Sequence, residues 1–372
     1  MRAAGGEGCC VRAAGGEGTV RVALTGATSP LGVRVRAAAA LEAGDGVEPL
    51  EVQPFRGGGP LPADLLADCD VLVHLGHEPA GESSLPPSDD APVEVDGAGT
   101  VPEPRDTAAL LAAAAEAGID HVVLLSSAMA YGAWPTNPVP ITEDAVLKPN
   151  PSLRFAVERA EEERLVAAWR SEHPDATAAV LRPTVQVAED RWSWLSRSAW
   201  DGGGVRPGGA EPPVQFVHLD DVASAVVLAA RKHLDGAFNV APDGWLKAEE
   251  LQALAGGPRV RLPDAAATRL QALRWRLGLV SSPPGVVPYV AQPWVVANDR
   301  LRAEGWVPRW SNEEAFVAAD RPGVLATITP KRRQELALGA AGVAIVGAAT
   351  GAGLAIRRAI RKRRPASSVR RG

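Results

Sequence analysis

The sequence predicts an α/β fold, a parallel, doubly wound sheet covered by helices, with a smaller C-terminal substrate lobe. Three observations lead to this prediction. Short apolar runs rich in β-branched residues recur along the first half of the chain, and each is typical of a buried strand. Helical segments lie between these runs, and a glycine-rich turn joins the first run to the first helix. Strands that alternate with helices pair in parallel, because each helix carries the chain back to the same edge of the sheet.

Four strands and three helices are predicted in the first half of the chain. The strands are expected at residues 19–25, 69–75, 121–126 and 176–182, and the helices at residues 33–43, 106–117 and 152–170. Asp106 suits the N-cap of the second helix, and Gly118 suits its end. The more mixed pattern that follows predicts a substrate lobe, mainly residues 184–320, with an amphipathic helix at 264–278 and a loop at 201–213.

Charge is unevenly distributed along the chain. The net charge is −5, yet the residues after 356 contain eight Lys or Arg and no acidic residue, so the remainder is strongly acidic. An acidic surface repels phosphates, which argues against nucleic-acid binding by the body of the protein. The cysteines at positions 9, 10 and 69 have neither disulfide nor zinc spacing, so we expect a reducing, cytoplasmic setting and no metal site.

Both ends of the chain are predicted to differ from the folded domain, which is expected to span residues 19–330. Residues 1–18 contain a Gly/Ala-rich heptamer twice and are predicted to be a disordered leader. Residues 336–356 carry no charge and are long enough for a transmembrane helix, and residues 357–372 form a basic tail. We therefore expect residues 336–372 to meet membrane lipid, either as a span or as an interfacial helix; an Ala/Gly-rich helix packed on the protein is the alternative.

The turn between the first strand and the first helix carries the first functional signal. It reads Thr25-Gly26-Ala27-Thr28-Ser29-Pro30-Leu31-Gly32. A glycine-rich turn from a strand to a helix lets backbone amides and the helix N-terminus approach a pyrophosphate, as in the Rossmann-type fold. The turn resembles a TGxxGxxG motif in which Gly26 and Gly32 are kept and Ser29 replaces the middle glycine. A side chain at that position is expected to crowd the phosphates; a tight turn that binds nothing is the alternative.

Further segments extend this resemblance from about residue 19 to residue 320. In chain order they are VLVHLGH at 71–77, LLSSAMAYG at 124–132, LRPTV at 181–185, FVHLDDVA at 216–223, GAFNVAPDG at 236–244 and the stretch at 298–316. Their order and spacing together resemble the extended short-chain dehydrogenases/reductases of the NAD-dependent epimerase/dehydratase family. The resemblance implies NAD or NADP as cofactor, a small-molecule substrate such as a nucleotide sugar, and a homodimer formed through residues 105–117 and 152–170.

The family's catalytic set is Asn, Ser, Tyr and Lys, and this chain departs from it. Ser127 matches the serine, with Tyr131 four residues later, but the YxxxK motif falls on Phe155 and Arg159. Phenylalanine has no ionisable proton, and arginine is not equivalent to lysine in size or geometry. The asparagine aligns with Glu94. The resemblance therefore predicts a divergent member that is weakly active or inactive.

The resemblance also indicates the residues that would contact a dinucleotide. These are Gly26, Thr28, Ser29, Leu31 and Gly32 in the turn, and His74, Leu75 and Gly76 at the end of the next predicted strand. The acidic residue that the family uses to bind the adenosine ribose is not found after its second strand, so the choice between NAD and NADP is open.

Three functions remain compatible with the sequence. The first is a nucleotide-binding fold with little or no oxidoreductase activity, acting as a binding module at a membrane. The second is an active epimerase, dehydratase or reductase in which Tyr131, His74 or His77 replaces the lost acid/base. The third is a lipid-binding tail on a domain that serves as a spacer. His218 and Asp221 are expected to be buried residues that tie the second lobe to the sheet.

Overall fold

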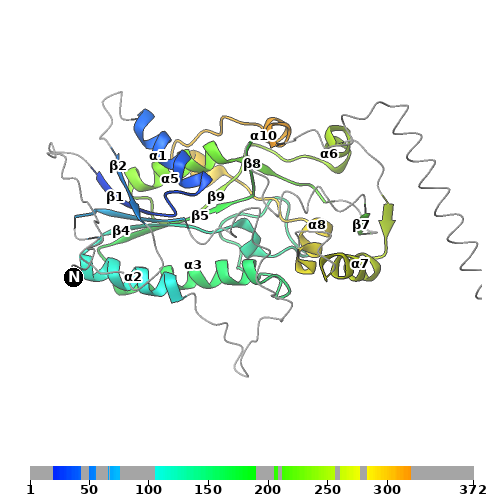
Figure 1. Cartoon of the computed structure of the whole chain (residues 1–372), viewed down its shortest axis with the longest axis horizontal. Coiled ribbons are helices and arrows are strands. Elements are labelled where there is room, and N and C mark those ends of the chain that lie inside the picture. The colour runs from blue at the N-terminus through cyan, green and yellow to red at the C-terminus, as the bar shows by residue number, and fades with distance from the viewer. Residues whose placement is uncertain are drawn as a thin grey trace, which may run out of the picture. The chain divides into compact units, whose positions relative to one another are not determined.

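A computed structural model describes residues 20–42, 50–55, 66, 68–75, 105–189, 205–207, 212–255, 260–276 and 283–319. The chain divides into two units after Ala319, and all of these residues belong to the first unit. Figure 1 shows the elements of this unit along a central sheet.

The central sheet has six strands in the order β2-β1-β3-β4-β5-β9, and every neighbouring pair is parallel. The strands are β1 (Val20–Thr25), β2 (Leu50–Phe55), β3 (Val71–His74), β4 (His121–Leu125), β5 (Thr177–Pro183) and β9 (Gly236–Val240). The chain runs one way from β1 to β2 and then returns to place β3 on the other side of β1. This is the doubly wound, Rossmann-type arrangement that the sequence predicts, with its switch point between β1 and β3.

Helices cover both faces of the sheet (Figure 1). Helices α1 (Pro30–Glu42) and α5 (Leu219–Lys232) lie on one face, and α2 (Arg105–Ala117) and α3 (Arg154–Glu172) lie on the other. Successive residues of a strand point to opposite faces, so each strand contributes to two separate cores. In β4, Val123 packs with α1 and α5, whereas Val122 and Leu124 pack with α2 and α3.

The first helix and an edge strand differ from the prediction. We expected the helix at residues 33–43, but α1 begins at Pro30 and therefore includes Gly32 in its first turn. Proline suits this first position because its φ angle is already helical. An N–H group at that position would have no acceptor within the helix, so proline loses nothing by lacking one. Strand β2 has no counterpart among the four predicted strands. It lies at the edge of the sheet, and Gln53 and Pro54 interrupt the apolar pattern that marks a buried strand.

The second lobe is built from short elements. Its two-stranded sheets pair β6 (Val185–Val187) with β8 (Phe216–His218), and β7 (Val205–Pro207) with β10 (Val260–Leu262). Its helices are α6 (Ala248–Ala255), α7 (Asp264–Arg276), α8 (Val287–Ala291), α9 (Asp299–Ala303) and α10 (Asn312–Ala319), with two 3₁₀ turns, η2 (Ala128–Tyr131) and η3 (Pro284–Val286).

Two features of this half differ from the prediction. Helix α5 and strand β9 fall within residues 184–320 but belong to the main sheet and its covering layer, not to the lobe. The predicted loop at 201–213 contains the short strand β7. Helix α5 and strand β9 form one more strand-and-helix repeat of the parallel sheet, which the short segments around them obscured in the sequence.

Two buried polar residues tie the lobe to the sheet, as predicted. Both carboxylate oxygens of Asp221 accept backbone N–H groups, from Arg309 at 2.9 Å and Trp310 at 3.1 Å. The His218 ring stacks on Trp310 with 4.1 Å between ring centroids and accepts the N–H of Asp220 at the start of α5. Burial raises the pKa of Asp221 above its usual range, and the two backbone donors oppose that rise.

The predictions for the two chain ends fall outside the residues that the structure describes. These are the leader at 1–18, the membrane segment at 336–356 and the basic tail at 357–372. In the part of the chain that is described, no helix is both long enough and apolar enough to span a membrane.

Candidate functional site

The glycine-rich turn lies at the carboxyl end of β1, next to the switch point. Gly26 has a φ of 68°, a conformation that side chains rarely allow. A Cβ atom on Gly32 would lie 2.2 Å from the carbonyl oxygen of Gly26, so only glycine fits there. Thr28 is exposed and Leu31 is buried beneath the turn. The two glycines that the motif keeps are thus required by the shape of the turn and its close approach to the first helix.

Ser29 changes what this turn offers to an anion. Its Oγ accepts the N–H of Gly32 at 3.0 Å, which makes Ser29 the N-cap of α1. Pro30 has no N–H, and the N–H of Ser29 itself is bonded to the carbonyl of Gly26 at 2.9 Å. Several donors that a helix N-terminus normally presents to a phosphate are therefore missing or already used. The structure adds this capping bond to the crowding that the sequence predicts.

A hydrogen-bonded network of polar groups runs along the carboxyl ends of β1 and β3; His74 in it is half-buried. His74 Nδ1 lies 2.8 Å from Thr25 Oγ1, and His74 Nε2 lies 3.3 Å from Thr107 Oγ1 in α2. Thr107 in turn donates to Glu162 Oε1 in α3 at 3.4 Å. The backbone N–H of Leu75 also donates to Thr25 Oγ1, at 3.2 Å.

Glu162 determines which group donates in the hydrogen bonds of Thr107 in this network. An ionised carboxylate only accepts, so the Thr107 hydroxyl donates to Glu162 and accepts from His74 Nε2–H. His74 Nδ1 and Thr25 Oγ1 then share the next hydrogen bond. Both ring nitrogens of His74 are thus engaged in the hydrogen-bond chain. Gly76 and His77, the next two predicted site positions, lie outside the described residues.

Arg159, at the position of the family's lysine, extends the hydrogen-bonded network. Its Nη1 lies 2.8 Å from Glu162 Oε2 and donates to the carbonyl of Leu125, the last residue of β4, at 3.2 Å. Arg159 is 4% exposed and Glu162 is 5% exposed. Burial raises the pKa of Glu162, and the charge of Arg159 opposes this rise. We call these residues the edge relay: Thr25, His74, Thr107, Glu162 and Arg159.

Phe155 and Ser127 occupy two further positions of the catalytic set that the resemblance implies; the remaining one, Glu94, lies outside the described residues. Phe155 packs against the apolar core of the second lobe, and the Arg159 guanidinium lies 5.3 Å from the centroid of its ring. Ser127 lies two residues after β4 and is buried; its Oγ accepts the N–H of Met129 at 3.2 Å and caps η2. Ser127 thus remains in place, but a side chain without an acid/base function stands where the tyrosine would be.

Tyr131 belongs to a second buried network. Its hydroxyl accepts from Arg182 Nη1 at 2.6 Å and donates to Asn239 Oδ1 at 2.9 Å. Burial raises the pKa of Tyr131 to about 12, although the charge of Arg182 opposes the rise. A general acid/base works best with a pKa near the operating pH, so this hydroxyl suits a structural role.

The polar residues that hold these side chains were not predicted from the sequence. Glu163 binds the Arg182 guanidinium with 2.6 Å between Oε2 and Nη2, and it accepts a very short hydrogen bond from Ser126. A sequence signal for them existed. Glu162 and Glu163 lie three and four residues after Arg159, on the side of α3 that faces the sheet, where a charged residue needs a partner.

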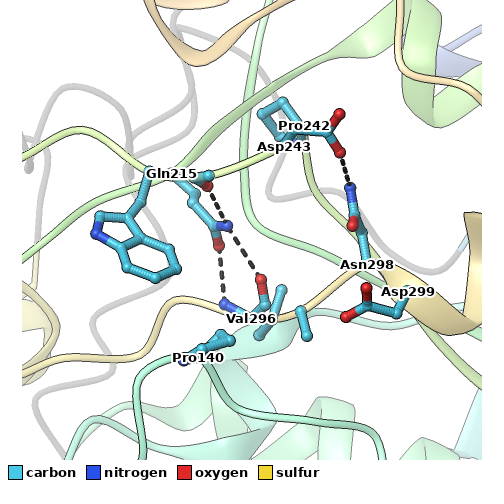
Figure 2. Close-up of a pocket in the computed structure, with 10 residues that line it drawn as sticks. Pro140, Gln215, Pro242, Asp243, Val296, Asn298 and Asp299 are labelled. Atoms are coloured by element: carbon cyan, nitrogen blue, oxygen red, sulfur yellow. Dashed lines mark hydrogen bonds between the residues drawn. The ribbon is translucent and has the colours of Figure 1, made fainter.

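A separate hollow lies in the second lobe (Figure 2). Its wall includes Pro140, the Gln215 side chain, the loop after β9 and the start of α9. Gln215 bridges Gly244 and Val296, while Asn298 donates to Asp243 at 2.9 Å. None of the predicted site residues lines this hollow. Within the described ranges, no three His, Cys, Asp or Glu residues are grouped to hold a metal ion.

Comparison with known sequences supports the resemblance to the family. Residues 65–241 match the model of the NAD dependent epimerase/dehydratase family. The resemblance predicted from the motifs is thereby confirmed. The uncharacterized protein Rv0501 of Mycobacterium tuberculosis (strain ATCC 25618 / H37Rv) is 29% identical over 201 residues, 53% of each chain. The chain thus spans about half the length of the curated relatives that it matches.

Solved structures share the fold at low sequence identity. A short-chain dehydrogenase/reductase superfamily protein from Agrobacterium tumefaciens, solved with bound NAD, is 20% identical with a TM-score of 0.55; the match covers 86% of this chain and 99% of that one. The UDP-glucose 4-epimerase of Thermus thermophilus, solved with NAD, is 18% identical with a TM-score of 0.54, covering 81% and 97%. Both of these structures share the fold of this chain, and both were solved with NAD bound.

Proposed function

We propose that this protein is a nucleotide-binding member of the epimerase/dehydratase family that has little or no oxidoreductase activity. One observation carries the proposal. Phe155 and Arg159 stand at the positions of the tyrosine and lysine, and the charge of Arg159 is neutralised by Glu162 inside the protein. Losing a positioned acid/base costs roughly 10²–10⁴-fold in rate. The site that remains favours binding over turnover.

The ligand that we propose is NAD or NADP, bound weakly. The fold and the requirement for glycine at positions 26 and 32 support a dinucleotide over the turn. The N-cap bond of Ser29 weakens that site, because it occupies the Gly32 N–H. A nucleotide sugar is the second ligand class, since structures of this fold have been solved with UDP-glucose or UDP-glucuronic acid beside NAD.

A second candidate is an active NAD(P)-dependent enzyme on a nucleotide sugar or related polyol. The retention of Ser127, two residues after β4, favours it. It needs a substitute acid/base, and Tyr131, with a pKa raised to about 12 by burial, suits that task poorly. His74 has both ring nitrogens bonded to threonine hydroxyls in the edge relay. We therefore place this candidate second.

We propose that residues 336–372 associate with a membrane and that the folded domain stays in the cytoplasm. The uncharged stretch and the basic tail in the sequence support this. We also propose a homodimer through α2 and α3, as the family resemblance implies.

Turnover by the full chain tests the proposed function. NAD and UDP-glucose are supplied to the wild type and to the double variant Phe155→Tyr/Arg159→Lys, and product is measured by chromatography. We expect no turnover by the wild type and at most a trace by the double variant, because Glu162 still pairs with the new lysine and Ser29 still caps α1. Turnover by the wild type at the rate of an ordinary epimerase refutes the proposal. Ser127→Ala and Tyr131→Phe then identify the hydroxyl responsible.

A further inference from the structure

The edge relay lies at the ligand-binding edge that is typical of this fold. Thr25, His74 and Leu125 are the last residues of β1, β3 and β4, three neighbouring strands of the sheet. Ligands of open α/β sheets bind beyond the carboxyl ends of the strands, at the switch point. Here that switch point lies between Thr25 and His74, which are register partners. The relay therefore determines which charges and donors the sheet presents at its ligand-binding edge.

Glu162 pairs with Arg159, the one residue of the edge relay that is always positively charged. Its Oε2 lies 2.8 Å from Arg159 Nη1, one helical turn away on α3, and its Oε1 is held by Thr107 from α2. Both partners of this ion pair are buried, with at most 5% of either residue exposed. A carboxylate fixed from two helices cannot leave the guanidinium without stranding a buried charge.

We propose that Glu162 sets the affinity of this edge for a nucleotide, because it pairs with Arg159 and removes a cation that would otherwise bind the phosphate or ribose of the ligand. A guanidinium is well suited to bind phosphate oxygens, and a charge-assisted hydrogen bond is among the stronger polar contacts. Paired with Glu162, Arg159 adds no net charge to the site. The proposal rests on the proposed function and names the residue that limits binding.

The direct test removes the carboxylate and keeps its shape. Glu162→Gln is compared with the wild type and with Glu158→Gln, which makes the same chemical change one turn earlier, in an exposed pair with Arg154. Binding of NADH and of ADP-ribose to the full chain is measured by calorimetry at low and high salt. We expect Glu162→Gln to bind both probes about tenfold more tightly or better, with a gain that salt diminishes. Glu158→Gln should bind like the wild type. Equal affinity of a folded Glu162→Gln and the wild type overturns the proposal.

A second variant keeps the test valid if Glu162→Gln does not fold. Arg159→Met/Glu162→Met removes the pair together, a change that buried ion pairs often tolerate. The proposal expects this variant to bind NADH within about twofold of the wild type, because Arg159 contributes no net charge while Glu162 holds it. A tenfold loss would mean that Arg159 already contacts the ligand, and it overturns the inference. Turnover by the wild type would refute the proposed function but not this result, since only relative affinities decide the inference.

Discussion

Ser29 shows how one side chain alters a phosphate-binding turn while leaving its backbone path intact. The two glycines on either side keep the close approach between turn and helix, with 2.2 Å between the Gly26 oxygen and a Cβ added at position 32. Ser29 uses the Gly32 N–H as the helix cap that serine commonly makes. Stability of α1 and anion binding therefore compete for one donor.

Replacing Ser29 should restore binding in two steps. Ser29→Ala frees the Gly32 N–H but keeps a Cβ beside the phosphates, whereas Ser29→Gly removes both obstacles. We expect NADH affinity to rise in the order wild type, Ser29→Ala, Ser29→Gly, with about a tenfold gain for the glycine variant. Helix stability should change least for glycine, which caps nearly as well as serine. Calorimetry measures the affinities, and identical values for all three proteins would show that Ser29 does not limit binding.

Helices and strands differ in how far the sequence predicted them. The buried parallel strands and long helices were predicted to within a few residues, because a strand covered on both faces is apolar throughout. Edge strand β2 was missed because it has a neighbouring strand on one side only and its sequence is correspondingly mixed. The family resemblance located Ser127, Phe155 and Arg159 in sequence. It did not predict the edge relay, since Thr107 and Glu162 meet His74 only through tertiary packing of α2 and α3 on the sheet.

Helix α3 carries a structural ion pair beside the functional one. Glu163 binds Arg182 in β5 through both carboxylate oxygens and also holds Ser126. Glu163→Gln should lower the free energy of unfolding by about 3–5 kcal/mol, because it leaves a buried guanidinium without its counter-charge. Glu158→Gln on the same helix should cost at most about 1 kcal/mol, since its pair is exposed. Urea denaturation followed by circular dichroism measures both values. Similar small losses in the two variants would mean that Arg182 finds another partner.

Strand β4 begins with a histidine that makes stability depend on pH. His121 is fully buried, shares a hydrogen bond with Thr177 Oγ1 at 2.8 Å, and contacts the Ala229 carbonyl at 3.1 Å. Burial, with a smaller contribution from the stacked His233, lowers the pKa of His121 from 6.5 to about 4. Between these values the unfolded chain binds a proton that the folded chain does not. The contribution of His121 to stability is thus complete above about pH 6.5 and is lost as the pH falls towards 4.

The expected loss is about 3 kcal/mol in the free energy of unfolding, from roughly 1.4 kcal/mol for each pKa unit. His121→Phe keeps a ring of similar size beside His233 but cannot be protonated. It should be less stable than the wild type at pH 7, because Thr177 and Ala229 lose their partner, yet it should lose less stability on acidification. Denaturation curves at about pH 4 to 7 give both slopes. Equal slopes would assign the acid sensitivity to other groups, such as Asp235 beside Arg170.

At the scale of the whole molecule, the acidic body and basic tail predict where the protein resides. The uncharged stretch at 336–356 and attraction of roughly 1 kcal/mol per basic residue near an anionic leaflet should bring the chain to a membrane. Positive charge after a span favours the cytoplasm, which would place the folded domain outside, whereas a cofactor-type domain belongs inside. Lys331, Arg332 and Arg333 on the other flank reduce this conflict. Either the segment spans with the domain inside and the tail translocated, or it lies in the interface with both ends cytoplasmic.

Fractionation of cells that express the full chain distinguishes these arrangements. We expect the protein in the membrane fraction and the domain accessible to protease only after the cytoplasmic side is opened. Extraction by carbonate would exclude a span and favour an interfacial helix, whereas release by high salt alone would indicate attachment through the basic tail. A variant that ends at residue 330 is the matched control and should be soluble, because it lacks both the apolar stretch and the tail. A wild type found only in the soluble fraction would refute membrane association, and the apolar stretch would then be a helix that packs within the protein.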